Sequence, residues 1–278
     1  MKKLVLTGAA GRLGSYLREP LSKMCEELVS TDIADGIGKL YPGEHYEKGD
    51  LASLDDMMRV LKGADMVVHM GAYADEGPFE KLLGPNFIGA YNIWEAAYQN
   101  GLKRVVYASS IHAVGMHPKN EFINTETRHR PDTFYGLAKC FAEDLGSMYW
   151  DKRGLESVHM RILSCAQVTN ARALGSWLSY DDLIQLTQRC IETPVTGFSI
   201  IYGVSNNDRA PVDNAKASFI GYRPKDNAEQ FAAKILAEAP PMNPQDPGDM
   251  CHGGPFAKVE LGNSGVATMN IIDDSKKT

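Results

Sequence analysis

Cysteines, long apolar runs and clustered basic residues are all scarce in this sequence, and each scarcity argues against a class of protein. The five cysteines are odd in number and widely spaced, with no C-x-x-C pair, so we expect neither a disulfide framework nor a zinc site. No stretch approaches the roughly 18 apolar residues that span a bilayer, and the apolar run at 4–6 is too short for a secretory signal. The net charge of −6 comes without a Lys/Arg cluster, which argues against nucleic-acid or membrane partners. We therefore expect a cytoplasmic protein that binds small molecules.

What is present is the composition of an ordinary globular protein, with 44% hydrophobic residues in a chain of 278. Short apolar segments alternate with helical patterns, which predicts an α/β fold, a Rossmann-type doubly wound parallel sheet. We expect a single domain over 1–278, with a dinucleotide-binding core at 1–162 and a small C-terminal, mainly substrate-binding part at 163–278. The expected strands are 3–7, 27–31, 45–48, 65–70, 103–109, 156–162 and 198–204. The expected helices are those up to about 24, over 53–61, 85–101, 181–191 and 227–238, and one that contains Tyr135.

The first predicted strand runs directly into a glycine-rich turn, residues 8–14, and then into an amphipathic helix. Gly8, Gly11 and Gly14 are spaced G-x-x-G-x-x-G. Glycines at this position permit a tight turn and a close approach of the backbone to a pyrophosphate at the helix N-terminus. The order of strand, glycine turn and helix therefore indicates a dinucleotide site rather than a simple turn.

An acidic residue at the end of the second predicted strand bears on the choice of dinucleotide. Asp32 stands eighteen residues after Gly14, where a carboxylate can accept hydrogen bonds from both ribose hydroxyls of NAD. NADP would bring its 2′-phosphate against this carboxylate, and no Arg or Lys follows at once to offset the repulsion. The sequence therefore favours NAD, although Asp32 could also simply begin a polar loop.

Two further polar residues have structural explanations beside the functional ones. Asp50 could meet the adenine, or it could serve only the helix whose N-cap is expected at Ser53. Asn86 lies at the expected start of the 85–101 helix, where capping is the ordinary explanation. Neither residue decides the function by itself.

The fifth predicted strand delivers hydroxyl and imidazole groups to its carboxyl end, which is where ligands bind in open α/β sheets. These groups belong to Ser109, Ser110 and His112. His117 follows, but no Cys, His or carboxylate at ligand spacing completes a metal site, so we expect no metal.

A phenol and an amine then stand four residues apart, at Tyr135 and Lys139, after a long polar loop. On a helix, residues at this spacing share a face. A tyrosine has an ordinary pKa of about 10, and we expect the neighbouring ammonium, with a second positive charge nearby, to lower the pKa of Tyr135 so that it can act as a base. The spacing is weak evidence alone, because a half-exposed Tyr beside a solvated Lys gives the same pattern.

Taken together and in this order, these residues make the chain resemble the extended short-chain dehydrogenase/reductase family. In that family Ser and Tyr hydrogen-bond the reacting oxygen, Tyr is the base, and Lys lowers its pKa and holds the nicotinamide ribose. The family pattern Ser-x-x-x-x-Gly fits Ser110 and Gly115, so the resemblance implies that Ser110, and not Ser109, is catalytic with Tyr135 and Lys139.

Within that family the chain is most similar to the bacterial NAD-dependent uronate dehydrogenases, which oxidise the anomeric carbon of galacturonate or glucuronate to a lactone. Segments that look alike include LVLTGAAGRLG (4–14), RPDTFYGLAKCFAEDL (130–145) and ARALGSWLSYDD (171–182). Arg172 falls where that group places an Arg on the substrate carboxylate, a planar two-pronged contact. The resemblance implies cofactor contacts from Gly8, Gly11, Arg12, Leu13, Gly14, Asp32, Asp50, Leu51, Gly71, Ala72, Tyr135 and Lys139. It implies substrate contacts from Ala74, Ser110, Ile111, His112, Tyr135, Ser164 and Arg172.

The chain departs from that group at two expected pocket positions. Ile111 and Ala74 stand where the group has Asn and Ser, and both changes remove hydrogen-bonding groups. Because an unmet hydrogen bond costs about 1 to 3 kcal/mol, specificity among sugar hydroxyls should differ. The paired tryptophans of the group are also replaced, by the segment 209–212. The substrate could therefore be a hexuronate or a 6-sulfonated hexose such as sulfoquinovose.

The expected function is thus NAD-dependent oxidation of an acidic sugar, and two other classes remain open. A nucleotide-sugar epimerase or dehydratase shares the same three residues, but it usually has a larger C-terminal domain and retains its NAD. A dinucleotide-binding protein without chemistry typically lacks the Tyr-x-x-x-Lys pair. We also expect a homo-oligomer, a dimer or higher, because a dimer through the long helices is common in the family. The tail after Pro240 is expected to wrap the surface or contact a partner.

Overall fold

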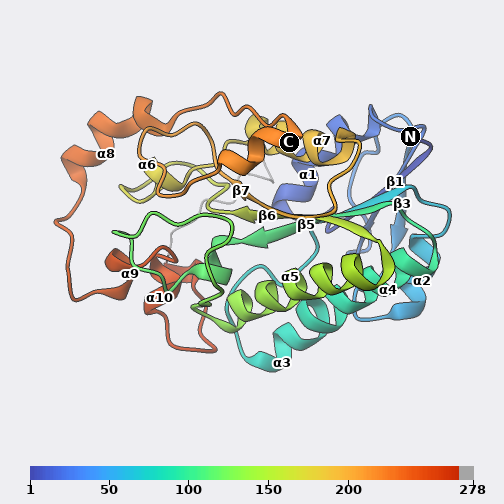
Figure 1. The fold of residues 1–278 in the computed structure, drawn as a ribbon, viewed down its shortest axis with the longest axis horizontal. Helices are drawn as coiled ribbons and strands as arrows, with labels where there is room; N and C mark the ends of the chain where they lie inside the picture. Colours follow the sequence, from blue (N-terminus) through green and yellow to red (C-terminus); the bar gives the residue numbers. More distant parts are fainter. Residues whose placement is uncertain (269–278) are drawn as a thin grey trace.

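A seven-stranded, wholly parallel sheet forms the centre of the computed structural model, which describes residues 1–268 (Figure 1). The strand order is β3-β2-β1-β4-β5-β6-β7. Because the order reverses between β1 and β4, the sheet is doubly wound, as the alternation of segments predicted. The strands are β1 (Lys3–Thr7), β2 (Glu27–Asp32), β3 (Glu44–Lys48), β4 (Met66–His69), β5 (Arg104–Ser110), β6 (Glu156–Ile162) and β7 (Phe198–Gly203).

Helices cover both faces of this sheet, and the alternation of side chains along the strands explains why both faces are apolar. Leu4 and Leu6 of β1 pack against α1 and α7, whereas Val5 between them faces α2, α4 and α5. Figure 1 shows the same two layers around the sheet. The covering helices are α1 (Arg12–Ser22), α2 (Leu54–Val60), α4 (Gly89–Gln99), α5 (Phe134–Arg153) and α7 (Tyr180–Glu192). No helix within residues 1–268 is long and apolar enough to cross a membrane.

The predicted strands all exist, with ends that shift by one or two residues, and most predicted helices start close to where they were expected. Ser53 caps α2 as predicted, since its side chain accepts a hydrogen bond from the Asp56 N–H. The helix predicted over 227–238 begins as a 3-10 turn, η4 (Ala228–Phe231), and continues as α8 (Ala232–Glu238). The long α5 starts at Phe134, directly after its N-cap Thr133, and so places Tyr135 in its first turn.

The predicted role of Asn86 as a helix cap is wrong. The helical region begins earlier, with α3 (Phe79–Leu82) and the π-helical segment η1 (Leu83–Ile88), and continues into α4. Pro85 within it has no N–H to donate, and wider π turns accommodate such an interruption. Asn86 is buried inside this segment, where its side chain accepts from the Tyr73 N–H at 2.8 Å and donates to the Tyr73 carbonyl at 3.0 Å. It therefore anchors the loop after β4.

The chain beyond Ile162 contributes β7 and α7 to the same sheet and then returns over the carboxyl ends of the strands (Figure 1). Its shorter elements are α6 (Ala173–Ser176), η3 (Ala215–Ile220), α9 (Pro247–Met250), α10 (Pro255–Lys258) and η5 (Val266–Thr268), and the 3-10 turn η2 (Ile111–Val114) lies earlier, after β5. We call residues 251–266 the C-terminal strap. The tail was expected at the surface, but this part of it reaches residues predicted to bind substrate.

Candidate active site

The turn between β1 and α1 is packed so closely that only glycine fits at two of its positions. Gly8 has φ +69°, and a Cβ there would lie 2.5 Å from the Gly71 nitrogen. A Cβ on Gly14 would lie 2.1 Å from the Gly8 carbonyl oxygen. Gly11 precedes α1 and provides no side-chain cap for the N–H groups of its first turn. Such a helix start can bind a phosphate group.

Asp32 ends β2 at the edge of this glycine turn. Its two carboxylate oxygens accept hydrogen bonds from the Ala10 N–H at 3.0 Å and the Ala34 N–H at 3.2 Å. A partly exposed carboxylate held there suits the ribose hydroxyls of NAD. The other residues predicted to contact the cofactor start α1 or follow β3 and β4, namely Arg12, Leu13, Asp50, Leu51, Gly71 and Ala72. The residues present therefore fit NAD.

Asp50 also has the structural role that the sequence left open. Its side chain accepts a hydrogen bond from the Ala52 N–H at 2.9 Å, and its own N–H donates to Asp56 at 3.0 Å. Both bonds shape the start of α2. The structure therefore shows a structural role for Asp50 at the start of α2.

Three predicted catalytic side chains meet where β5 ends and α5 begins. The Ser110 hydroxyl hydrogen-bonds the Tyr135 side chain and accepts from the His112 N–H at 3.2 Å. Lys139 lies one turn further along α5, with only 3% of its surface exposed. Its Nζ donates to the Ala108 carbonyl at 2.7 Å and lies 5.2 Å from the centre of the Tyr135 ring.

The structure also distinguishes the two adjacent serines. The Ser109 hydroxyl donates to Glu143 at 2.5 Å, and the same carboxylate binds Arg161 at 2.7 Å. This ion pair is buried, and its hydrogen bonds hold the pKa of Glu143 down to about 2 despite burial. Ser109 is thus part of a buried framework, whereas Ser110 contacts Tyr135.

The expectation that the protein's own ammonium lowers the pKa of Tyr135 is wrong for the chain alone. Burial of its hydroxyl end raises the pKa of Tyr135 to about 12, although the bond from Ser110 acts in the opposite direction. Burial lowers the pKa of Lys139 to about 7. The reason is geometric, because the Lys139 amine bonds to the Ala108 carbonyl and, at 3.3 Å, to the Tyr107 hydroxyl rather than to Tyr135.

Arg172, the predicted anion-binding residue, precedes α6 and faces the C-terminal strap. Its NH2 group donates to the His252 carbonyl at 2.9 Å, and Gly254 lies so close that a Cβ there would come within 2.4 Å of the Arg172 Nε. Within residues 1–268 no carboxylate forms an ion pair with it. Burial lowers the pKa of Arg172 to about 10, which still leaves the guanidinium charged at neutral pH.

The remaining predicted substrate residues differ in how far their side chains are exposed. His112 is buried and lies beside Tyr135, with the two ring centres 5.7 Å apart. Ala74 is exposed in the loop after β4, and Ser164 is partly exposed after β6. Ile111 instead belongs to a buried apolar cluster with 1% of its surface exposed, so the structure shows a packing role for it.

Sequence analysis missed two residues that shape this region. Phe256 of the strap stacks on the His112 ring with centres 4.1 Å apart. Glu76, fully buried, accepts from the Tyr135 N–H at 3.0 Å and from the Gly262 N–H at 2.9 Å, and so joins the start of α5 to the strap. A phenylalanine in a Pro- and Gly-rich tail and an acid in a loop carry no local pattern, so only the fold reveals them.

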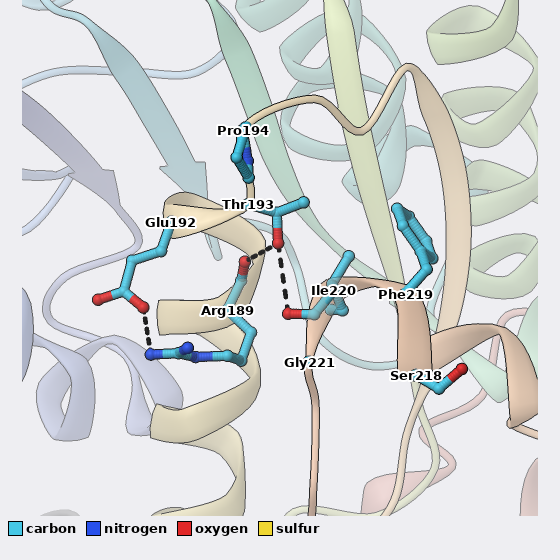
Figure 2. A pocket seen from close by; sticks show the side chains of 8 residues that line it. All are labelled: Arg189, Glu192, Thr193, Pro194, Ser218, Phe219, Ile220 and Gly221. Atoms are coloured by element: carbon cyan, nitrogen blue, oxygen red, sulfur yellow. Dashed lines mark hydrogen bonds and ion pairs between the residues drawn. The ribbon is translucent and has the colours of Figure 1, made fainter.

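A hollow lies near the amino end of β7, at the opposite end of the strands from the predicted catalytic residues. Its volume is about 280 Å³, and Figure 2 shows the residues that line it, at the end of α7 and in η3. Thr193 bridges the two walls through bonds to the Arg189 and Ile220 carbonyls, and Arg189 pairs with Glu192. None of the predicted site residues lines it. Among residues 1–268 no group of three or more His, Cys, Asp or Glu side chains is arranged to hold a metal ion.

Comparison with known proteins gives relatives along nearly the whole chain. Residues 4–166 match the model of the NAD dependent epimerase/dehydratase family. A uronate dehydrogenase of Pseudomonas putida is 42% identical over 92% of this chain and 95% of its own length. One from Agrobacterium fabrum is 40% identical over 92% and 97%.

Solved structures agree with the sequence comparison. A mutant uronate dehydrogenase from Agrobacterium tumefaciens complexed with NAD superposes with a TM-score of 0.89 at 39% identity, covering 94% of this chain and 98% of that one. A glucuronic acid dehydrogenase from Chromohalobacter salexigens gives 0.90 at 37%, covering 94% and 98%. The expected fold class is therefore confirmed.

Proposed function

Because the chain belongs to the NAD dependent epimerase/dehydratase family, we propose that it oxidises the anomeric hydroxyl of an acidic hexose to an aldonolactone. It is an NAD-dependent sugar-acid dehydrogenase, similar to uronate dehydrogenases over more than nine-tenths of its length. A hexuronate such as galacturonate or glucuronate is the first candidate substrate. A 6-sulfonated hexose such as sulfoquinovose is the second, because its sulfonate is also an anionic group that the Arg172 guanidinium could hold.

One observation supports this proposal above the others. Arg172, a guanidinium without a carboxylate partner in residues 1–268, lies on the same edge of the sheet as Ser110, Tyr135 and Lys139. A partly buried cation that hydrogen-bonds only to a carbonyl is poorly compensated, and an anionic ligand would compensate it. Its position at the same end of the strands as the base therefore fits a substrate that carries both an acid group and an oxidisable hydroxyl.

We assign the proton chemistry to the three catalytic side chains. Tyr135 takes the proton of the anomeric hydroxyl, and Ser110 holds the oxygen from which it leaves. NAD, when bound, supplies the hydride acceptor and a positive charge on the nicotinamide. The pKa of Tyr135, about 12 in the chain alone, must fall for this step, and Lys139 contributes by placing its amine on the same helical face.

We further propose that residues 1–162 form the NAD-binding core and that residues 163–278 serve mainly in substrate binding, through groups such as Arg172. The glycine turn and Asp32 support the first assignment, and the contacts of Arg172 with the strap support the second. Ala74, exposed in the loop after β4, would leave one sugar hydroxyl without the partner that a Ser provides.

The deciding experiment is NADH formation over a panel of galacturonate, glucuronate, sulfoquinovose, glucose and galactose. We expect turnover of one or more acidic sugars and little of the neutral ones. The product is identified by mass spectrometry before and after the lactone hydrolyses. Sugar conversion without NADH release would instead favour an epimerase or dehydratase, and tight NAD binding without any turnover would favour a binding protein.

We also propose a homodimer through the outer faces of α4 and α5. Tyr91 and Tyr98 of α4 are each 44% exposed, and Phe141 and Met148 of α5 are 38% and 50% exposed. Large apolar side chains gathered on neighbouring helices are typical of interfaces. Light scattering should give twice the mass of one chain, and Tyr91→Glu with Met148→Glu should give a monomer. Phe122→Glu, at an exposed side chain in the loop before α5, is the control.

A further inference from the structure

Asp132 contacts two parts of the active site, His112 and the start of α5, although nothing in its sequence context marks it. It lies two residues before α5, and its side chain is buried. One carboxylate oxygen, Oδ2, is 2.7 Å from the Nδ1 atom of His112, and the other, Oδ1, accepts from the Thr133 hydroxyl at 2.9 Å. Thr133 in turn caps the helix that carries Tyr135. The carboxylate therefore links His112 to the start of the catalytic helix.

Glycines surround this carboxylate so tightly that no other residue fits in their place. A Cβ on Gly115 would lie 2.0 Å from the Asp132 Oδ2 atom, and a Cβ on Gly253 would lie 1.9 Å from it. A Cβ on Gly136 would lie 3.1 Å from Oδ1 and 2.3 Å from the His112 carbonyl oxygen. None of the three has a positive φ, so their backbone conformation is open to other residues. Close packing against Asp132 and His112 is what requires glycine.

The contact with Asp132 determines which nitrogen of His112 carries a proton. A carboxylate only accepts hydrogen bonds, so Nδ1 must be the donor. In the neutral ring Nε2 is then an acceptor, and no hydrogen bond within residues 1–268 occupies it. Phe256 stacks on the ring at 4.1 Å with 24° between the planes, and Tyr135 meets it at 69°. The ring is thus held in one orientation.

We propose that Asp132 is a positioning residue, which holds His112 as the Nδ1–H tautomer so that Nε2 accepts a hydrogen bond from a sugar hydroxyl beside Tyr135. The proposal rests on the sugar-oxidising function proposed above and adds a residue to it. The Asp132 carboxylate also attracts the Arg172 guanidinium, although the two form no ion pair. His112 and Arg172 would then orient opposite parts of one sugar.

Asp132→Asn is the informative substitution because it preserves shape and reverses hydrogen bonding. If the Asn oxygen keeps the bond from the Thr133 hydroxyl, its NH2 group donates to Nδ1, and the proton of the neutral ring moves to Nε2. The sugar hydroxyl would then meet a donor instead of an acceptor. We expect kcat/KM for the acidic sugar to fall about 10- to 100-fold, as is usual when the group that orients a ligating histidine is lost, and the KM for NAD to stay unchanged. Asp144→Asn is the matched control, since that exposed acid lies on α5 and faces a different histidine, His129.

A double-mutant cycle separates positioning from a purely structural role. If Asp132 acts through His112, Asp132→Asn should have no further effect on kcat/KM once His112→Ala has been made. Additive losses in the two variants would show that Asp132 acts on the site by another route, and would overturn the proposal. Thermal melting of each variant identifies any loss that comes from unfolding.

Nitrogen-15 NMR of histidine-labelled protein gives a readout that does not depend on the sugar. At alkaline pH, where imidazoles are neutral, the signals of His112 should show the proton on Nδ1, and Asp132→Asn should move it to Nε2. His112→Ala identifies the signals by their loss. A proton on Nε2 in the wild type would overturn the proposal, whereas the expected tautomer in a protein that oxidises no sugar would count against the proposed function alone.

Discussion

Cationic side chains have different partners at the amino ends and at the carboxyl ends of the strands, which we call the amino edge and the carboxyl edge of the sheet. At the amino edge Arg104 of β5 binds Glu156 of β6 at 2.8 Å and donates to the Cys190 and Thr193 carbonyls, each at 2.8 Å. At the carboxyl edge Lys139 binds a carbonyl and a hydroxyl, and Arg172 binds one carbonyl. Arg104 therefore has a carboxylate and several carbonyls as partners. Within residues 1–268, Lys139 and Arg172 hydrogen-bond only to neutral groups.

This difference indicates which charges hold the framework and which serve ligands. A buried cation paired with a carboxylate has its desolvation offset within the fold, and breaking the pair leaves a costly single charge. A buried cation without such a pair costs free energy until a ligand arrives, and such perturbed groups are characteristic of functional sites. Substitutions at the two edges should therefore affect different measurements, stability at one and catalysis at the other.

The largest expected effect is at the carboxyl edge, from Tyr135→Phe. Removing the hydroxyl removes the base, and we expect kcat to fall roughly 10⁴-fold, which corresponds to about 5.5 kcal/mol. The melting temperature and NAD binding, measured by calorimetry, should stay close to those of the wild type. Full turnover by this variant would remove Tyr135 from the chemistry.

At the amino edge, Glu156→Ala should act on stability alone. It leaves Arg104 with no exposed surface and no carboxylate, and we expect the free energy of unfolding to fall by about 3–5 kcal/mol in a denaturant titration. Values of kcat and KM for the folded enzyme should not change. Glu192→Ala breaks an exposed pair at the same edge and should cost less than about 1 kcal/mol. Equal losses in the two variants would contradict the contrast between buried and exposed pairs.

Arg172→Met should impair only the recognition of acidic sugars. We expect kcat/KM for them to fall roughly a hundredfold, about 2.7 kcal/mol, mainly through KM, because the anionic group loses its two-pronged partner. Arg209→Met, at an exposed guanidinium that already pairs with Glu229, is the control. If the wild-type enzyme oxidised neutral glucose as fast as a hexuronate, Arg172 would not be an anion-binding residue.

The smallest expected effect is a rise in the free energy of unfolding in Lys139→Met, opposite in sign to the fall expected for Glu156→Ala. The pKa of Lys139 is about 7 in the folded chain and an ordinary 10.5 in the unfolded chain. Between these pH values only the unfolded chain holds the proton, so the stability of the wild type rises with pH. Replacing the buried amine should therefore raise the free energy of unfolding by about 1–3 kcal/mol at pH 7 and below. This gain in the free energy of unfolding should fade towards pH 10.5. The variant should be inactive, because it lacks the catalytic amine. A less stable variant at pH 7 would mean that Lys139 supports the framework.

Sequence patterns predicted the strands, the glycine turn, and the order of Ser110, Tyr135 and Lys139, because each depends on neighbours within a few residues. The same patterns failed at Asn86, which lies inside a longer helical region and bonds to Tyr73 in the loop after β4. Ile111 was expected in the pocket only through the resemblance, and its side chain packs in an apolar cluster. Both side chains contact residues outside their own segment.

By itself, then, the sequence determined the sheet, the dinucleotide turn and the spacing of phenol and amine, since strand alternation, glycine geometry and helical periodicity are local properties of the chain. Only the tertiary structure decided that the Lys139 amine bonds to the Ala108 carbonyl, that Asp132 holds His112, and that Phe256 returns from the far end of the chain to cover that ring. Those contacts join segments separated by many residues, and their energies come from burial and from the orientation of charges. Such quantities exist only once the chain has folded.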